Sequence, residues 1–231
     1  MYQELQPARS EFVPIRQLNY HVRLWGPATS DLPPLVLVHG WMDVSASYQF
    51  VVDAFSQAFA QGRRIIAPDW RGFGLTAPPV PTDHYFFPDY LADLDQLLDH
   101  YAPGTPVDLV GHSMGGNVAM FYAGARPARV RRLVNLEGFG MPASKPTKAP
   151  KRYAEWMDEL KALQRGEMAL KTYDSADGVA RRLMKTNPRL PQDKAQWLAR
   201  LGCDEIQGYL LSKPVPAEVF EAQFLQTLVA K

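Results

Sequence analysis

A serine stands at the centre of the sequence GHSMG at residues 111–115, which fits the pattern GxSxG. The apolar stretch 107–110 precedes it and a helical pattern follows it. A serine hydroxyl is a weak nucleophile, but a sharp strand-to-helix turn exposes its oxygen and aims backbone N–H groups at the oxyanion formed during acyl transfer. Gly111 and Gly115 stand where a Cβ would collide with the neighbouring strand and helix. In this setting the pattern predicts that Ser113 is a nucleophile for acyl transfer rather than part of a coincidental turn.

The elements around this serine follow an alternating order. Strand-like apolar stretches alternate with segments whose apolar residues recur at helical spacing. We expect strands at residues 15–25, 35–38, 65–67, 107–110 and 130–136, and helices at 47–60, 88–101 and directly after the serine. This order predicts a doubly wound α/β fold with a mostly parallel sheet, whose ligand site lies at the carboxyl ends of the strands.

The composition changes after the last of these strands. Residues 141–150 are rich in Pro, Lys, Ser and Thr, which is typical of an exposed connection. The pattern from about residue 150 to 201 is helical only, so we expect a helical insertion that caps the active edge of the sheet. The chain is therefore divided into a core at residues 1–140, a cap at 141–200 and a tail at 201–231.

Composition narrows the class of protein. With 231 residues, 46% hydrophobic and 21% charged, the chain is expected to be a soluble globular protein. The net charge of +1 argues against nucleic acid or an anionic membrane as a partner. Its one cysteine, Cys203, rules out an internal disulfide and fits a reducing compartment. Charges and Pro7 stand where a signal peptide would need an apolar core, so we predict a cytoplasmic protein.

Three motifs resemble those of the α/β-hydrolase fold superfamily and stand in that family's order. They are LVLVHGW at residues 35–41, PDWRGFG at 68–74 and GHSMG at 111–115. The resemblance covers roughly residues 15–140, and more loosely the cap to about 200. It implies the α/β-hydrolase fold, with its C-terminal part truncated or replaced and with a helical cap inserted.

The resemblance also implies roles for particular residues. The oxyanion hole is formed by the backbone N–H groups of Trp41 and Met114. The residues expected beside the substrate are His39, Gly40 and His112. The reaction has two steps, in which Ser113 is acylated and water then releases the acid.

The serine and a nearby glutamate narrow the chemistry further. Haloalkane dehalogenases and epoxide hydrolases of this fold place Asp at the elbow, so Ser113 implies ester, lactone or related acyl substrates. Glu137 comes just after strand 130–136, which is similar to the subset of the family whose acid follows this strand. Its implied role is to hold a histidine in the right tautomer. The alternative is that Glu137 caps a loop or pairs with an arginine.

The general base is not visible in the sequence. The family supplies this histidine from a loop after its last strand, downstream of the cap. None of the five histidines follows the cap; they are His21, His39, His84, His100 and His112. We expect each to be a packed or surface histidine, and His84, in the loop 78–88, is the best substitute.

The tail resembles a different family. Residues 201–224 are similar to the end of an EAL domain, the cyclic-di-GMP phosphodiesterase barrel, and Gln207 matches a glutamine that lines that family's site. The metal-binding carboxylates of that family are absent, so the tail cannot form its active site. We interpret the tail as a strand at 206–211 and a terminal helix from Ala217, recruited for packing or left by a gene fusion.

The tail also bears on the edge of the sheet. Hydrolases of this family continue with two more strands, without which strand 130–136 would be an unpaired apolar edge. We therefore expect either that residues 206–211 add to this edge, or that the chain is poorly soluble or forms homo-oligomers.

The sequence thus supports one leading hypothesis and two alternatives. The leading one is an esterase-like serine hydrolase that needs no cofactor and no metal and whose partner is a small ester-like molecule. Without its base, the remaining rate would be orders of magnitude below that of a full triad. The first alternative is a catalytically inactive binding protein that keeps the pocket and the cap. A weaker one, suggested only by the tail, is a cyclic-di-GMP protein.

Overall fold

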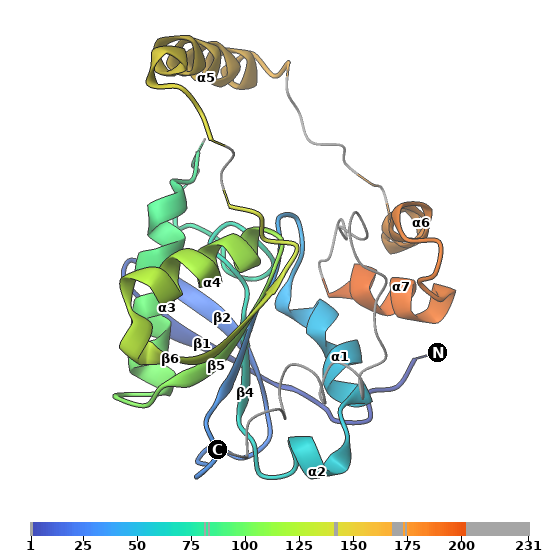
Figure 1. The fold of residues 1–231 in the computed structure, drawn as a ribbon. Helices are drawn as coiled ribbons and strands as arrows, with labels where there is room; N and C mark the ends of the chain where they lie inside the picture. Colours follow the sequence, from blue (N-terminus) through green and yellow to red (C-terminus); the bar gives the residue numbers. More distant parts are fainter. Residues whose placement is uncertain are drawn as a thin grey trace.

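Six strands form one mixed sheet in a computed structural model of the chain, which describes residues 2–80, 82, 84–140, 143–167, 173 and 175–201 (Figure 1). The strands are β1 (Arg9–Ile15), β2 (Leu18–Trp25), β3 (Leu35–Val38), β4 (Ile65–Pro68), β5 (Val107–His112) and β6 (Val130–Leu136). Their order across the sheet is β1-β2-β4-β3-β5-β6. From β4 to β6 neighbouring strands run parallel, whereas β1 and β2 pair in antiparallel fashion. The predicted mostly parallel α/β fold is confirmed.

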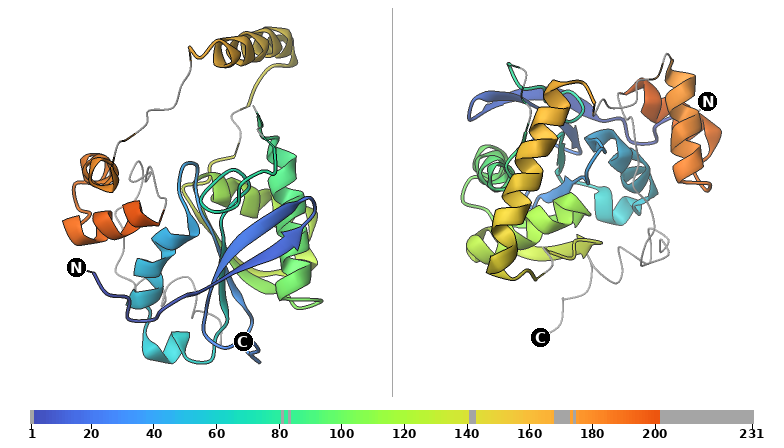
Figure 2. Two further views of the ribbon diagram at one scale, coloured as in Figure 1. Left: turned by 180° about the vertical axis from the view of Figure 1, so that it is seen from behind. Right: turned by 90° about the horizontal axis from the view of Figure 1, so that it is seen from above.

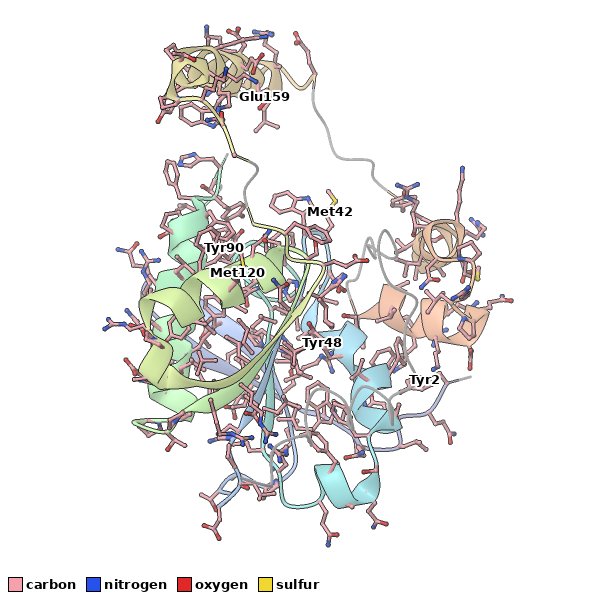
Figure 3. All side chains as sticks on the ribbon, in the orientation of Figure 1. Tyr2, Met42, Tyr48, Tyr90, Met120 and Glu159 are labelled. Atoms are coloured by element: carbon pink, nitrogen blue, oxygen red, sulfur yellow. The ribbon has the colours of Figure 1, made fainter. Side chains whose placement is uncertain are left out.

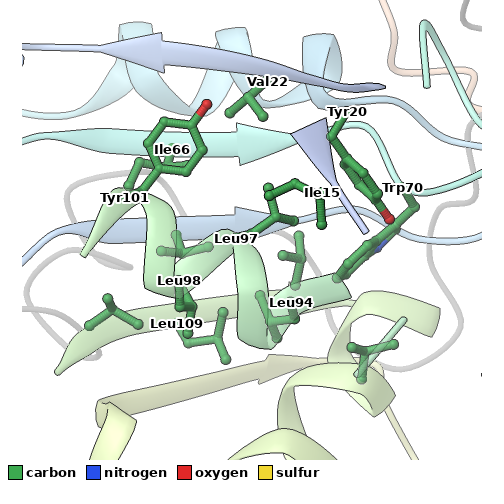
Figure 4. Packing of buried hydrophobic residues seen from close by; sticks show 14 of the residues in the cluster. Ile15, Tyr20, Val22, Ile66, Trp70, Leu94, Leu97, Leu98, Tyr101 and Leu109 are labelled. Carbon is green, nitrogen blue, oxygen red and sulfur yellow. The ribbon is translucent and has the colours of Figure 1, made fainter. Parts of the chain in front are cut away.

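Helices cover both faces of this sheet. On one face lie α1 (Gln49–Ala54) and α2 (Gln57–Ala60), and on the other lie α3 (Phe87–Tyr101) and α4 (Met114–Ala125). Figure 4 shows Leu94 and Leu98 of α3 packed near Leu109 of β5. Because both faces are covered, β3 and β4 are continuous apolar runs whose residues are all buried. The described residues also include the short 3₁₀ helices η1 (Ser45–Tyr48), η2 (Pro127–Arg129) and η3 (Pro146–Lys148).

The first predicted strand is one half of a hairpin. The expected strand at 15–25 corresponds to β2, and β1 precedes it in full antiparallel register. Arg16 lies in the tight turn between them with φ 53°. The prediction missed β1 because its residues mix polar and apolar side chains, and five of the seven are exposed or half-buried.

The expected single helix at 47–60 is interrupted. Phe55 leaves the helical conformation with ψ 144°, and the Ser56 hydroxyl then caps α2 by accepting from the Phe59 N–H. The break lets both phenyl rings enter the core, where their centroids lie 4.8 Å apart. Tertiary burial thus overrides a helical period that runs through the whole segment.

In the described part of the predicted cap lie the helices α5 (Ala149–Gln164), α6 (Ala176–Thr186) and α7 (Gln192–Arg200). The pair α6 and α7 buries Leu183 and Leu198 in a cluster with Val44, just ahead of α1. Tyr2 lies beside α1 and α7 (Figure 3), with its ring centroid 5.3 Å from that of Trp197. This helix pair is therefore anchored on the α1 side of the core.

Helix α5 stands apart from that pair, above α3 and α4 (Figures 1 and 2). None of its residues is buried, and Tyr153, Trp156 and Met157 leave much of their apolar surface exposed. Trp156 approaches His84, with ring centroids 6.3 Å apart. The structure therefore has helices where the cap was expected, while the boundaries of core, cap and tail stay a prediction.

Strand β6 forms one edge of the sheet as far as the structure describes it, since it pairs with β5 there and the other edge is β1. The edge is less apolar than expected because Arg131 and Arg132 interrupt it, and charged side chains discourage edge-to-edge pairing. The strand and helix predicted at 206–211 and from Ala217 lie outside the described residues. Pairing of this edge by the tail, or by a second copy of the chain, stays a prediction.

No helix within the described part of the chain is both long enough and apolar enough to cross a membrane.

Candidate active site

Ser113 joins β5 directly to α4. The strand ends at His112 and the helix begins at Met114, so the serine alone makes the turn. Its backbone has φ 51° and ψ −114°, a conformation that a residue with a Cβ rarely adopts and that costs about 1–3 kcal/mol. The Asn117 N–H donates to the Ser113 carbonyl oxygen at 3.0 Å, which starts the helix at once. Such strain persists only where the surrounding fold holds it, and it is common at functional sites.

The glycines on either side of Ser113 have the steric role that the sequence predicts. A Cβ on Gly111 would lie 2.3 Å from the Gly115 carbonyl oxygen, across the turn. A Cβ on Gly115 would lie 2.3 Å from the Val38 carbonyl oxygen and 2.5 Å from that of His39. Backbone atoms cannot move aside as a flexible side chain can. Glycine at 111 therefore lets the turn from β5 to α4 close, and glycine at 115 lets α4 approach β3.

The turn after β3 lies against the serine. A Cβ on Gly40 would be 3.1 Å from the Cβ of Ser113 and 3.1 Å from the Nδ1 atom of His112. Trp41 follows, and its indole packs edge-on against Phe73 with centroids 5.1 Å apart. The Met114 N–H belongs to the first turn of α4, where an N–H has no acceptor within its own helix. The two amides predicted as oxyanion donors therefore come from the two segments that meet at Ser113.

His39 is a fixed part of the framework. Its ring is fully buried, and its Nε2 atom accepts a hydrogen bond from the Trp70 N–H at 2.8 Å. The Nδ1 atom lies 2.8 Å from the Gly40 carbonyl oxygen, and since a carbonyl can only accept, Nδ1 carries the proton. Burial lowers the pKa of His39 to about 4. Substrate contact by His39 stays a prediction, and its ring nitrogens are both occupied by the backbone.

Asparagine side chains tie the loop after β6 to α4. The Asn135 amide donates to the Gly138 carbonyl oxygen at 2.6 Å and accepts from the Gly138 N–H at 2.8 Å. The Gly140 N–H donates to the Asn117 side chain at 2.7 Å. Glu137 stands inside this loop with φ 60°. Neither asparagine was predicted from the sequence, although an Asn two residues before a candidate acid is a signal for such a side-chain-bonded turn.

Glu137 lies close to a histidine, but to the one beside the serine. Its Oε2 atom is 3.8 Å from the Nε2 atom of His112. Burial lowers the pKa of His112, and the negative charge of Glu137 opposes that effect. Both side chains are about one fifth exposed, so the pair lies at the rim of the site. The structure brings Ser113, His112, Gly40 and Glu137 together, whereas the catalytic role of Glu137 stays a prediction.

The electrostatic coupling of this pair gives a direct expectation for Glu137→Gln. Removing the carboxylate charge is expected to lower the pKa of His112 further below the ordinary histidine value of about 6.5, because burial then acts without opposition. An NMR titration of the imidazole Cε1 protons measures the shift. Glu155→Gln on α5, where the glutamate pairs with Lys151, is the matched control and should leave the His112 midpoint unchanged. A rise of the midpoint in Glu137→Gln contradicts the assignment of the pair.

The remaining histidines lie away from the elbow. His100 packs edge-on against Tyr101 at the end of α3, with centroids 4.7 Å apart. His84 packs against Phe86 at 4.7 Å, in the loop below α5. His21 is bound to Asp69 on the far side of β4. His84 as substitute base stays a prediction.

A cavity of about 580 Å³ lies between the β1–β2 turn and the segment that leads into α3. The β1–β2 turn, the loop before α3 and Arg71 line it, and its lining does not include Ser113. Arg71 is held by two hydrogen bonds to Asp93, at 2.6 and 2.9 Å, so its guanidinium is committed to the core. This cavity therefore adds no group to the serine site.

The family profile described as alpha/beta hydrolase fold matches residues 33–196. The chain belongs to that family. The matched region contains the turn after β3, the elbow and the loop after β6, which are the segments that meet at Ser113. The matched region ends before the tail. The comparisons give no support to the resemblance of residues 201–224 to an EAL domain. Residues from 202 onward also lie outside the described part of the chain.

Curated relatives include serine hydrolase-like proteins and epoxide hydrolases. A "Serine hydrolase-like protein" from Danio rerio is 27% identical over 88% of this chain and 61% of its own length. "Epoxide hydrolase 2" from Siraitia grosvenorii is 38% identical over 52% of this chain and 35% of its own length. The chain thus spans less than two thirds of the length of either relative. Among solved structures, "Thioesterase Domain From Curacin Biosynthetic Pathway" superposes with a TM-score of 0.69 over 84% of this chain and 67% of its own, at 24% identity, which supports the fold.

Proposed function

We propose that the chain carries the nucleophilic half of a serine hydrolase that cleaves a small carboxylic ester. The strained backbone of Ser113, held between β5 and α4 by two glycines that admit no side chain, carries this proposal. The serine hydrolase-like relative supports it. The similarity to an epoxide hydrolase does not oppose it, because a hydroxyl at the elbow suits acyl transfer whereas that class of the fold uses a carboxylate.

The proposed reaction follows from the groups around the elbow. The Ser113 oxygen attacks the ester carbonyl carbon, and the negative charge that develops on the carbonyl oxygen is stabilised by the N–H groups of Trp41 and Met114. The serine proton passes to a base and from it to the departing alcohol as the C–O bond breaks. Water then attacks the acyl-enzyme, releases the acid and restores the hydroxyl.

Glu137 is the acid that we propose for this reaction. It follows β6 directly, and its carboxylate already lies near an imidazole nitrogen at 3.8 Å. A negative charge at that point favours the protonated form of any histidine that takes up the serine proton. The base itself is the member of the triad that we leave unassigned.

The Ser113→Ala variant tests the proposal. We expect kcat/KM for the hydrolysis of p-nitrophenyl butyrate to fall at least about 100-fold, since removing the nucleophile removes the acyl-enzyme path. Mass spectrometry of the fluorophosphonate-treated wild type is expected to find the adduct on the peptide that contains Ser113. The matched control is Ser30→Ala, whose hydroxyl donates to the Gly62 carbonyl oxygen far from the elbow. Absence of any adduct on Ser113 contradicts the proposal.

A second candidate is a binding protein that holds an ester-like ligand without turning it over. One observation favours this candidate. Both ring nitrogens of His39 are hydrogen-bonded to backbone groups, so His39 cannot serve as the base. Saturable ligand binding by calorimetry, with the same turnover in wild type and Ser113→Ala, supports this candidate. Saturable turnover that Ser113→Ala abolishes excludes it.

We also infer the surroundings in which the protein acts. Its net charge of +1 and one cysteine suit a small neutral substrate in a reducing cytoplasm, with neither nucleic acid nor membrane as partner. Sedimentation of the purified chain tests whether the β6 edge mediates homo-oligomers.

A further inference from the structure

A second serine stands at the end of a hydrogen-bonded Ser–His–Asp array at the β1 edge of the sheet. The Ser10 hydroxyl on β1 lies 2.5 Å from the Nε2 atom of His21 on β2. The Nδ1 atom of the same ring lies 2.7 Å from the Oδ2 atom of Asp69, just after β4. Three neighbouring strands thus supply a nucleophile, a base and an orienting acid, in the connectivity that general-base catalysis requires.

The carboxylate fixes the direction of these hydrogen bonds. Burial raises the pKa of Asp69, but hydrogen bonds from His21 and from the N–H groups of Leu75 and Ser45 outweigh it, and the pKa falls to about 2. An ionised carboxylate only accepts, so the Nδ1 atom of His21 carries the proton. The Nε2 lone pair then accepts the hydrogen bond of the Ser10 hydroxyl, which is the arrangement in which an imidazole can take a proton from a serine.

The acid and the base are buried, and the nucleophile is accessible. His21 is 1% exposed and Asp69 is 2% exposed, so water hardly competes for their hydrogen bonds. Ser10 is exposed at the edge strand, where a small molecule can reach it. Phe12, directly opposite His21 in the register, packs on the imidazole with centroids 5.2 Å apart and offers an apolar neighbour for an acyl chain.

A cation lies across the strand pair from the serine. Arg23 is the antiparallel partner of Ser10, and side chains of directly opposite residues lie on the same face of a sheet. The Nε atom of Arg23 is buried, and it lacks a hydrogen-bond partner among the described residues. A buried donor without an acceptor is costly unless something accepts from it. An oxyanion formed on a group bound to Ser10 is a suitable acceptor.

We propose that Ser10 is a second nucleophile, which accepts acyl or phosphonyl groups from small activated esters independently of Ser113. The Ser10 oxygen bonds to the carbonyl carbon, its proton passes to the Nε2 atom of His21, and the resulting imidazolium is stabilised by Asp69. As the ester C–O bond breaks, the departing alcohol takes that proton. With a fluorophosphonate, the oxygen bonds to phosphorus and fluoride leaves. Arg23 stabilises the negative oxygen in both reactions.

Peptide mapping after reaction with a fluorophosphonate tests the proposal in the Ser113→Ala background, where the elbow cannot react. The expected result is an adduct on the peptide of Ser10. Ser30 and Ser47 are internal controls, because their hydroxyls donate to backbone carbonyls and not to a histidine. Equal labelling of all three serines, or none at Ser10, overturns the proposal. A missing adduct at Ser113 in the wild type bears only on the function proposed for the elbow.

Variants of the array separate activation from simple exposure. His21→Asn is expected to slow labelling of Ser10 at least about tenfold, as general bases contribute about 10²–10⁴-fold. Circular dichroism checks that this buried substitution leaves the chain folded. If His21→Asn does not fold, the variant Arg23→Gln is used, because it keeps the imidazole in place. This variant is expected to slow the labelling of Ser10 several-fold. If the folded variants label Ser10 at the same rate as the parent protein, Ser10 is an ordinary exposed serine and the proposal is overturned.

Discussion

Replacing Gly115 with alanine is expected to destabilise the fold by about 3 kcal/mol or more, because overpacking against rigid atoms exceeds what repacking can absorb. The added Cβ would lie 2.3 Å from the Val38 carbonyl oxygen and 2.5 Å from that of His39. Both contacts are with the backbone at the end of β3, so α4 and β3 have to separate. Urea unfolding followed by tryptophan fluorescence measures the change.

The same helix provides the control. A Cβ on Gly124, near the end of α4, would meet nothing within 4 Å. Gly124→Ala is therefore expected to stabilise the chain by up to about 1 kcal/mol, because alanine loses less backbone entropy in a helix. The two substitutions add the same methyl group to one helix and are expected to change stability in opposite directions. An unchanged midpoint for Gly115→Ala contradicts the close packing of α4 on β3.

The consequence of this contact extends to the proposed chemistry. Separation of α4 from β3 moves the Met114 N–H away from the Trp41 N–H, since one belongs to α4 and the other follows β3. The Gly115→Ala protein that remains folded is therefore expected to lose reactivity at Ser113 as well. Stabilisation of an oxyanion depends on donors that are already in place before the reaction.

Local sequence was enough to predict the elbow, for a physical reason. The glycines at 111 and 115, the apolar strand and the helix start lie within one short stretch, so sterics within that stretch define the turn. The order of strands and helices followed equally from periodicity. The hairpin partner β1 was missed because an edge strand with mixed side chains shows no clear period.

Contacts between distant segments could not be predicted in the same way. Ser10 went unnoticed because its proposed role depends on contacts with His21 and Asp69, which the sheet brings together from other strands. For Glu137 the sequence indicated a histidine as partner, and the structure places it next to His112. Which imidazole a carboxylate meets depends on loop geometry. Asn135 marks this turn locally, but the hydrogen bond from the Gly140 N–H to Asn117 joins segments that are distant in sequence.

His39 links the turn after β3 to the loop after β4, and its removal is expected to destabilise the fold by about 2–4 kcal/mol near neutral pH. In His39→Phe the ring volume is nearly kept, but the buried Trp70 N–H loses its acceptor. The Gly40 carbonyl oxygen loses its donor as well. Two buried backbone groups are then left without partners at one site.

This destabilisation is expected to shrink as the pH falls. The folded wild type holds His39 neutral with a pKa of about 4, whereas the unfolded chain takes up a proton near the ordinary value of about 6.5. Protonation of the unfolded state between these values lowers wild-type stability, by about 2 kcal/mol from about pH 7.5 to about pH 5. The phenylalanine variant has no such group and does not lose this stability.

The pH dependence of wild-type stability alone does not isolate His39, because a buried acid changes stability with pH in the opposite direction. The difference in unfolding free energy between wild type and variant is therefore needed. Burial raises the pKa of Asp43 to about 7, so the folded chain takes up a proton below that pH and gains stability. Asp43 is present in both proteins, so its effect largely cancels from the difference in unfolding free energy. The control is Leu109→Ala, a fully buried core truncation without a titratable group, whose difference from wild type is expected to stay constant with pH. A constant difference for His39→Phe as well would show that His39 is not held neutral by the fold.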